Sequence, residues 1–314
     1  MSSIMQTAAP TKSQSASRVA PANGKLRKFL PLYLSIAPYY ILFLVFGLFP
    51  VLFSLYLAFQ RWDGIGTMTF VGWNNFYFVL TDPIFGKAIF NTFAIWVIST
   101  IPMLCIALVL AFLLNQRSRS KLAYQLCFYI PNMTSIVAVT LIFQSFLGDQ
   151  FGLINQTLAA IHLPAVPWLT DPWGIKWSIA LMVIWRWTGY NALVYMAGLQ
   201  NIPTEYYDAA RTDGANTWDI FFNITLPLLR PIVLFTVISS TIGGLTLFTE
   251  PQVLFLTPAN NGGPGHEGLT MALYQYWQGF ASYQYGFGAA VGWIVFLILL
   301  VCTIINWRLV QRGE

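Results

Sequence analysis

An aromatic and polar cluster, W-R-W-T-G-Y-N, interrupts an apolar stretch at residues 185–191. Polar groups inside such a stretch are costly and indicate a functional site. On a helix, Trp187, Tyr190 and Asn191 lie at positions i, i+3 and i+4 and share one face. Aromatic rings beside an amide suit a sugar, whose C–H faces pack on rings while its hydroxyls form hydrogen bonds. The alternative is that these rings only pack between helices.

A second polar cluster, G-G-L-T-L-F-T-E-P-Q, occupies residues 243–252. Thr246, Thr249 and Glu250 lie at i, i+3 and i+4 of the helix expected there, toward its outer end. A carboxylate at this place either accepts hydrogen bonds from sugar hydroxyls or marks the point where the helix leaves the membrane. Both interpretations remain open.

Arg186 lies within the first of these clusters, and a pair of glycines, Gly243 and Gly244, begins the second. We expect Arg186 to point away from the face of Trp187 and to pair with an acid of this chain or of a partner, rather than to contact a substrate. Gly243 and Gly244 favour a close helix approach or a bend over ligand contact.

No combination of residues suited to covalent chemistry is visible. The sequence shows neither a nucleophile with a base and an orienting group nor a metal constellation, so it predicts no catalytic residue and no metal ligand. Cys105, Cys127 and Cys302 lie in apolar runs and are interpreted as small hydrophobic residues. No G-x-x-x-x-G-K-[ST] motif occurs, so the chain has no loop of its own for ATP phosphates. Any energy from ATP hydrolysis must therefore come from a separate subunit.

The composition places most of the chain in a lipid bilayer. Hydrophobic residues make up 57% of the 314 residues, charged residues 9%, and the mean hydropathy is +0.62. A soluble domain has about a quarter of charged residues. A spanning helix needs about 20 mostly apolar residues. Six runs qualify, at approximately 31–59, 89–114, 124–147, 178–199 and 231–250, with a last one that ends near Trp307. The sequence therefore predicts an all-α polytopic membrane protein with six transmembrane helices.

The residues before the first run form a separate segment. Residues 1–28 are rich in Ser, Ala, Thr and Gln, carry five Lys or Arg, and are typical of a disordered cytoplasmic tail. The run that follows is too long for a cleaved signal peptide and lacks an evident cleavage site. We therefore expect two parts, a basic tail at 1–28 and a transmembrane domain at 29–314.

The cations follow a topological pattern. Twelve of the sixteen Lys and Arg lie in the tail, in the loop near Arg117, in the connection at 200–230 that contains loop 201–227, and at the C-terminus, whereas the other three loops hold only Arg61, Lys87 and Lys176. Cations are retained on the cytoplasmic side. Both termini and loop 201–227 are therefore expected in the cytoplasm. The net charge of +5 reflects this topology, and we expect no nucleic-acid partner.

Loop 201–227 carries helix signals although it is charged. Glu205 places a negative charge near the positive end of a helix dipole. Gly214 is the residue type that most often ends a helix. Asn216 can cap a second helix, with Asp219 reaching back in a capping box. The pattern predicts helix, glycine turn, helix.

The second of these helices has an apolar stripe. Trp218, Phe221 and Phe222 lie at i, i+3 and i+4, and nothing obvious in this short loop buries them. We expect Pro227 to end the helix. The stripe requires a partner, either the membrane surface or another protein.

The same loop resembles a known family. Asp208-Ala209-Ala210, three residues, Gly214, nine residues and then I-T-L-P resemble the E-A-A-x3-G-x9-I-x-L-P signature of permease subunits of binding-protein-dependent ABC importers, with Asp208 in place of Glu. In that family the segment is a cytoplasmic coupling helix that seats in a groove of the ATPase. The resemblance assigns ATPase coupling to Glu205, Asp208, Ala209, Ala210, Gly214, Trp218, Ile224, Leu226 and Pro227.

Further motifs narrow the resemblance to carbohydrate importers, and to the first permease of the maltose, lactose and glycerol-phosphate systems. They are F-V-G-W-N-N-F from Phe70, Y-I-P-N-M from Tyr129, G-L-I-N from Gly152, L-F-T-E-P from Leu247, and N-G-G-P before the last span. The resemblance implies the type I ABC importer fold in its plain six-span form. It also implies that Trp187, Tyr190 and Thr246 lie near the sugar site, in agreement with the shared helical face.

The partners and cofactors follow from the resemblance. It implies a second homologous permease, a dimeric cytoplasmic ATPase that holds ATP and Mg²⁺, an extracytoplasmic sugar-binding protein, and a sugar substrate carried across the cell membrane by alternating access. The chain itself is expected to bind no cofactor. A different solute, such as glycerol phosphate or a polyamine, remains an alternative within the class. A stand-alone ion-coupled carrier is the alternative from another class.

Overall fold

The computed structural model describes residues 23–115, 121–255 and 261–311. The chain divides into two units, 1–53 and 54–314. Most of the predicted tail, residues 1–22, lies outside the described residues, and the first helix already begins at Asn23.

The first unit is helical wherever it is described. Helix α1 (Asn23–Leu42) continues through a π-helical segment, η1 (Phe43–Leu48), into α2 (Phe49–Ala58), within which the boundary between the units falls. The stretch Phe29–Ala58 is long and apolar enough to cross a membrane. This agrees with the first predicted span.

The second unit contains the other helices and one small antiparallel hairpin, in which Gln60 pairs with Phe70. Its strands are β1 (Gln60–Arg61) and β2 (Thr69–Phe70). Its helices are α3 (Asn74–Thr81), α4 (Pro83–Asn115), α5 (Lys121–Met133), α6 (Ile136–Leu147), α7 (Leu153–Ala160), α8 (Pro172–Gln200), α9 (Thr204–Thr212), α10 (Thr217–Ile220), η2 (Phe221–Thr225), α11 (Leu226–Leu245), α12 (Thr249–Leu254), η4 (Pro264–His266), α13 (Met271–Tyr276), η5 (Trp277–Ala281) and α14 (Tyr285–Gln311).

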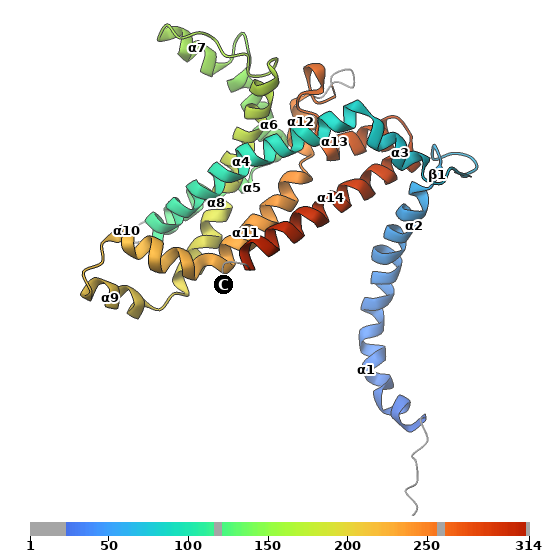
Figure 1. Ribbon diagram of the computed structural model, residues 1–314, viewed down its shortest axis with the longest axis horizontal. Coiled ribbons are helices and arrows are strands. Elements are labelled where there is room, and N and C mark those ends of the chain that lie inside the picture. The colour runs from blue at the N-terminus through green and yellow to red at the C-terminus, as the bar shows by residue number, and fades with distance from the viewer. Residues whose placement is uncertain (1–22, 116–120, 256–260, 312–314) are drawn as a thin grey trace, which may run out of the picture. The chain divides into compact units, whose positions relative to one another are not determined.

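Helices α4 and α8 pack along each other and form the centre of this unit (Figure 1). Small residues permit the close crossings, as is usual between membrane helices. Gly189 of α8 lies directly against the backbone carbonyl of Phe128, where a Cβ atom has no room. Gly198 lies close to the side chains of Leu229 and Ile232 of α11. These contacts place α8 between α5 on one side and α11 on another.

The two ends of α4 meet different parts of the chain. Near its beginning, Phe85 contacts Tyr274 of α13, with ring centroids 5.3 Å apart. Near its end, Phe112 contacts Phe221 of η2, also at 5.3 Å. Helices α9 and α10 therefore lie at the opposite end of the unit from α3 and α13 (Figure 1). We call these the α9 end and the α13 end.

Four helical stretches of the described chain are long and apolar enough to span a membrane: Phe29–Ala58, Pro83–Asn115, Thr217–Leu254 and Tyr285–Arg308. They correspond to the first, second, fifth and sixth predicted spans. Helix α8, the predicted fourth span, is 29 residues long but less apolar. Many of its side chains are buried among neighbouring helices, which reduces its need for lipid-facing residues.

The predicted third span is not one straight helix. Its two halves, Ala123–Met133 and Ile136–Leu147, are bent by 91° at a short break. Pro131 lacks the N–H that would extend the ladder of hydrogen bonds, and Ser135 adopts a non-helical ψ of 126°. The pair forms either a broken span or a re-entrant segment. Two connections that we expected to be loops also contain helices, α3 and α7.

Candidate functional site

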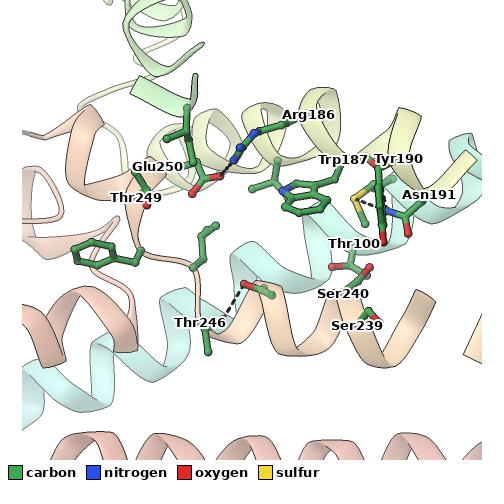
Figure 2. Close-up of a pocket in the computed structure, with 17 residues that line it drawn as sticks. Thr100, Arg186, Trp187, Tyr190, Asn191, Ser239, Ser240, Thr246, Thr249 and Glu250 are labelled. Carbon is green, nitrogen blue, oxygen red and sulfur yellow. Dashed lines mark hydrogen bonds and ion pairs between the residues drawn. The ribbon is translucent and has the colours of Figure 1, made fainter. Parts of the chain in front are cut away.

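A cavity of about 280 Å³ lies among helices α4, α6, α8, α11 and α12 (Figure 2). Its walls combine aromatic rings with hydroxyl, amide and charged groups, a mixture that is typical of small-molecule sites. The polar lining residues are Thr100, Arg186, Asn191, Ser239, Ser240, Thr246, Thr249 and Glu250. Below, this cavity is called the central pocket.

Helix α8 brings three predicted residues to the central pocket. Trp187, Tyr190 and Asn191 all line it, which confirms their shared helical face. The rings of Trp187 and Tyr190 meet edge to face at 5.6 Å, and the Asn191 amide donates to the Trp187 carbonyl at 3.0 Å. Asp171 caps the beginning of α8 by accepting hydrogen bonds from the N–H groups of Trp173 and Gly174. The rings of Trp187 and Tyr190 therefore form an apolar part of the pocket wall, and the Asn191 amide lies beside them.

The second predicted cluster also lines the pocket, but not through helical spacing. Helix α11 ends at Leu245 and α12 begins at Thr249, so Thr246 and Glu250 lie on different elements. The expectation of one continuous helix was therefore wrong. A buried hydrogen bond of 2.6 Å from the Thr270 hydroxyl to the Leu247 carbonyl stabilises the break, because it satisfies a carbonyl that the helix no longer pairs.

Of the glycine pair beside this break, only Gly244 makes the close helix contact that we expected, and both glycines line the central pocket. Gly244 packs closely on the indole of Trp96 in α4, and no larger residue fits there. Gly243 has open space where its Cβ would be and lines the central pocket. Close helix packing at Gly244 thus brings α11 up to α4 just before α11 ends.

The position of the Arg186 side chain contradicts another expectation. It does not point away from the pocket but lines it beside Trp187, whose ring lies 5.7 Å from the guanidinium carbon. Its Nη1 lies 3.7 Å from Oε1 of Glu250 on α12, so it does pair with an acid of this chain. Figure 2 shows the two side chains reaching toward each other across one end of the pocket. A half-buried arginine is stabilised by a counter-charge, and the buried Glu250 supplies it.

The sequence analysis did not identify three hydroxyl residues that line the central pocket. Thr100 lies on α4, and Ser239 and Ser240 lie on α11. Hydroxyl residues are common in membrane helices, where they often bond to a carbonyl one turn earlier. Their sequence positions alone therefore gave no signal that they face a cavity.

The segment at the α9 end forms the predicted helix, turn and helix. Gly214 has a φ of +82°, the left-handed region that glycine tolerates best. Asn216 and Asp219 form the predicted capping box, in which each side chain accepts from the other's backbone N–H. Helix α9 carries Glu205 in its first turn.

The second helix of this segment does not end at Pro227. Helix α10 passes through the π-helical η2 directly into α11, and Pro227 lies in the first turn of α11. Two features explain the difference. The first turn of a helix does not need the N–H that proline lacks, and the wider η2 turn precedes it.

The apolar stripe of this segment is mostly exposed. Trp218 is 71% exposed and Phe222 55%, and their rings stack at 6.1 Å. Phe221 instead packs on Phe112. The other residues assigned to coupling lie at or near the same surface: Glu205, Asp208, Ala209, Gly214 and Pro227 are exposed, and Ala210, Ile224 and Leu226 are half-buried.

The α13 end holds an ion-pair network that sequence reasoning did not predict. Glu267 contacts Lys87 at 2.6 Å and the buried Lys176 at 2.7 Å. Burial raises the pKa of Glu267, but the hydrogen bonds and charges of Lys176 and Lys87 outweigh it and hold this pKa below its ordinary value. Burial also raises the pKa of Tyr274, as does its hydrogen bond to Asp82. Within the described residues, no group of three or more His, Cys, Asp or Glu could hold a metal ion.

Known proteins match this chain over most of its length. Residues 92–312 match the family model described as "Binding-protein-dependent transport system inner membrane component". The arabinooligosaccharides transport system permease protein AraP of Bacillus subtilis is 36% identical over 279 residues, which cover 88% of this chain and 87% of AraP. The lactose transport system permease protein LacF of Rhizobium radiobacter is 35% identical over 303 residues, 95% of this chain and 97% of LacF.

A solved structure shares the fold. A chain of the bacterial alginate ABC transporter, crystallised in complex with an alginate pentasaccharide-bound periplasmic protein, superimposes with a TM-score of 0.78 at 25% identity and covers 93% of this chain and 98% of its own. Together with the family match, this confirms the all-α importer-permease fold expected from the sequence. The chain therefore belongs to the binding-protein-dependent transport system inner membrane components, the multi-pass permease subunits of ABC importers, and is a membrane transport subunit rather than an enzyme.

Proposed function

We propose that this permease carries a di- or oligosaccharide across the cytoplasmic membrane by alternating access driven by ATP. Its partners are a second homologous permease, a dimeric cytoplasmic ATPase that binds ATP and Mg²⁺, and an extracytoplasmic sugar-binding protein. The names of AraP and LacF, and the alginate-bound periplasmic protein of the structural neighbour, support a carbohydrate over other solutes.

One observation carries the proposal: a single helical path joins the exposed surface at the α9 end to the central pocket. It begins with Trp218 in α10, continues through η2, and reaches Ser239 and Ser240 in α11. At 1.5 Å per residue, this path is roughly 30 Å long. Because a helix is stiff along its axis, a displacement of the exposed end moves the pocket wall. This is the mechanical link that an ATP-driven importer requires.

The central pocket is the proposed sugar site. Trp187 and Tyr190 offer rings to the C–H faces of a sugar, and Asn191 offers an amide beside them. Thr246, Thr249 and Glu250 add polar groups from the other wall. The permease performs no covalent chemistry there; it binds, releases and reorients.

The exposed surface at the α9 end is the proposed ATPase-docking surface. It presents the stacked Trp218 and Phe222 to solvent, and large exposed aromatic residues are typical anchors of protein interfaces. Asp208 and Arg211, paired at 3.5 Å, lie in the preceding helix α9. The docking surface is proposed to face the cytoplasm, and the distribution of Lys and Arg supports a cytoplasmic position for both termini as well. A cysteine at Ala215 should then react with a permeant thiol reagent but not with an impermeant one in intact cells, and a cysteine at Ile65 should react with both.

Transport by the whole complex tests the function. Proteoliposomes with both permeases and the ATPase, with ATP inside and the binding protein outside, should accumulate lactose or an arabinooligosaccharide. The same vesicles without ATP, or with this permease alone, should not. Uptake driven by an ion gradient in vesicles that hold this permease alone would contradict the proposal and favour an ion-coupled carrier.

A further inference from the structure

Two opposite charges face each other inside the central pocket without a direct hydrogen bond. Arg186 Nη1 and Glu250 Oε1 are 3.7 Å apart, whereas N–H···O bonds are about 2.7–3.2 Å long. The Nε atom of Arg186 is buried and has no hydrogen-bond partner among the described residues. The carboxylate belongs to a residue that is only 5% exposed. Both groups therefore keep unused hydrogen-bonding capacity at the pocket wall.

An ion pair with a purely structural role would be expected to form direct hydrogen bonds, and this pair forms none. Buried charges are stable when they are both paired and hydrogen-bonded. Here the guanidinium is held over the Trp187 ring at 5.7 Å, and the carboxylate is fixed on the short helix α12. The two side chains come from different elements, so neither can approach the other freely. A ligand in the pocket is in a position to satisfy both.

We propose that Arg186 and Glu250 together recognise a hydroxyl pair of a neutral sugar and discriminate against acidic sugars. This inference rests on the proposed function and names its substrate class. A sugar hydroxyl donates to the Glu250 carboxylate and accepts from the Arg186 guanidinium, and an oxygen about 2.8 Å from both atoms fits a 3.7 Å gap. A vicinal hydroxyl can engage a remaining N–H group of the Arg186 guanidinium that faces the pocket. The adjacent Trp187 ring holds the sugar face.

An acidic sugar has a poorer fit for an electrostatic reason. Its carboxylate pairs with Arg186 but also places a second negative charge beside the buried Glu250, and like charges in a desolvated site repel strongly. The shared fold does not decide this preference, since the structural neighbour imports the acidic polysaccharide alginate. The two side chains decide it.

The test uses matched probes in proteoliposomes that hold the complete complex. The probes are lactose and arabinotriose, and the same two sugars with the terminal hydroxymethyl group oxidised to a carboxylate. The same binding protein serves every permease variant, so its own preference cancels when acid-to-neutral uptake ratios are compared. The wild-type complex should import at least one neutral probe and prefer it to its acid.

Two single variants have distinct expected results. Glu250→Gln should lower neutral uptake about tenfold and raise the acid-to-neutral ratio about tenfold, because one charge-assisted hydrogen bond is lost and the repelling charge is gone. Arg186→Gln should lower the uptake of both probes without raising that ratio. Glu267→Gln, which removes a carboxylate from an ion pair outside the pocket, should leave the ratio unchanged.

A double variant separates recognition from a structural role. If the pair only joined α8 to α12, replacing both charges by neutral residues of similar size would restore transport. We expect Arg186→Met combined with Glu250→Gln to remain impaired although it assembles with the ATPase. Restored neutral uptake in this double variant, or an unchanged ratio in Glu250→Gln, overturns the inference alone. A wild-type complex that imports none of the probes contradicts the proposed function itself.

Discussion

Phe112, near the end of α4, packs edge to face against Phe221 of η2, with ring centroids 5.3 Å apart and ring planes at 78°. This contact fastens the beginning of the helical path described above to the central helix α4. A displacement of the path at this end should therefore be shared with α4.

The first prediction concerns this aromatic pair. Phe221→Ala and Phe112→Ala should each lower the thermal stability of the purified complex, and each should slow ATP-driven uptake. A double-mutant cycle should give an interaction energy of about 0.5–1.5 kcal/mol, the usual value for edge-to-face rings. The measurement is thermal unfolding in detergent. Strictly additive effects would show that the two rings do not stabilise each other.

The second prediction compares two tryptophans of equal exposure. Trp218 lies at the α9 end and Trp73 at the α13 end, and each is 71% exposed. Trp218→Ala should weaken ATPase association by about 2 kcal/mol or more, roughly 30-fold, because exposed aromatic anchors dominate interface energies. Trp73→Ala should leave it unchanged. Quantitative co-purification checks both, and equal losses would contradict the docking role.

The third prediction concerns Gly214, whose φ of +82° is unfavourable for any residue with a side chain. Gly214→Val should cost about 1–2 kcal/mol or more in local strain and should distort the turn between α9 and α10. Membrane insertion should persist while ATPase association and transport are lost. Gly86, which is helical and has open space around it, gives the control variant Gly86→Val. Normal ATPase binding by Gly214→Val would argue against the coupling role of this turn.

The fourth prediction follows from the lowered pKa of Glu267. Because the folded state binds this proton less tightly than the unfolded chain, with its ordinary pKa of 4.5, the stabilisation is complete above that value. It is lost as the pH falls through the lower folded-state pKa. Glu267→Gln should lower the unfolding temperature at pH 7, and its difference from the wild type should shrink toward pH 3.5.

Thermal melts across this pH range check the prediction. Glu205→Gln, which changes an exposed carboxyl at the α9 end, should follow the wild-type curve. A Glu267→Gln difference that stays constant down to pH 3.5 would show that the two lysines do not depend on the charge of this carboxylate.

Local patterns in the sequence predicted what a few neighbouring residues control. The helical period placed Trp187, Tyr190 and Asn191 on one face, and the pocket contains all three. The capping box of Asn216 and Asp219 and the turn at Gly214 also formed as expected, because their hydrogen bonds and backbone angles are set within one helical turn. Apolar run lengths predicted a membrane protein for the same local reason.

Only the tertiary structure decided which distant groups meet. Arg186 faces Glu250 because α11 ends at Leu245 and redirects the chain into α12, and Glu267 reaches both Lys87 and Lys176 because three separate elements converge at the α13 end. Such contacts depend on how helices cross, and crossings depend on the summed packing of many side chains, such as Gly244 on Trp96 and Gly189 on Phe128. No short stretch of sequence contains that sum, so the composition of the pocket became visible only in the folded chain.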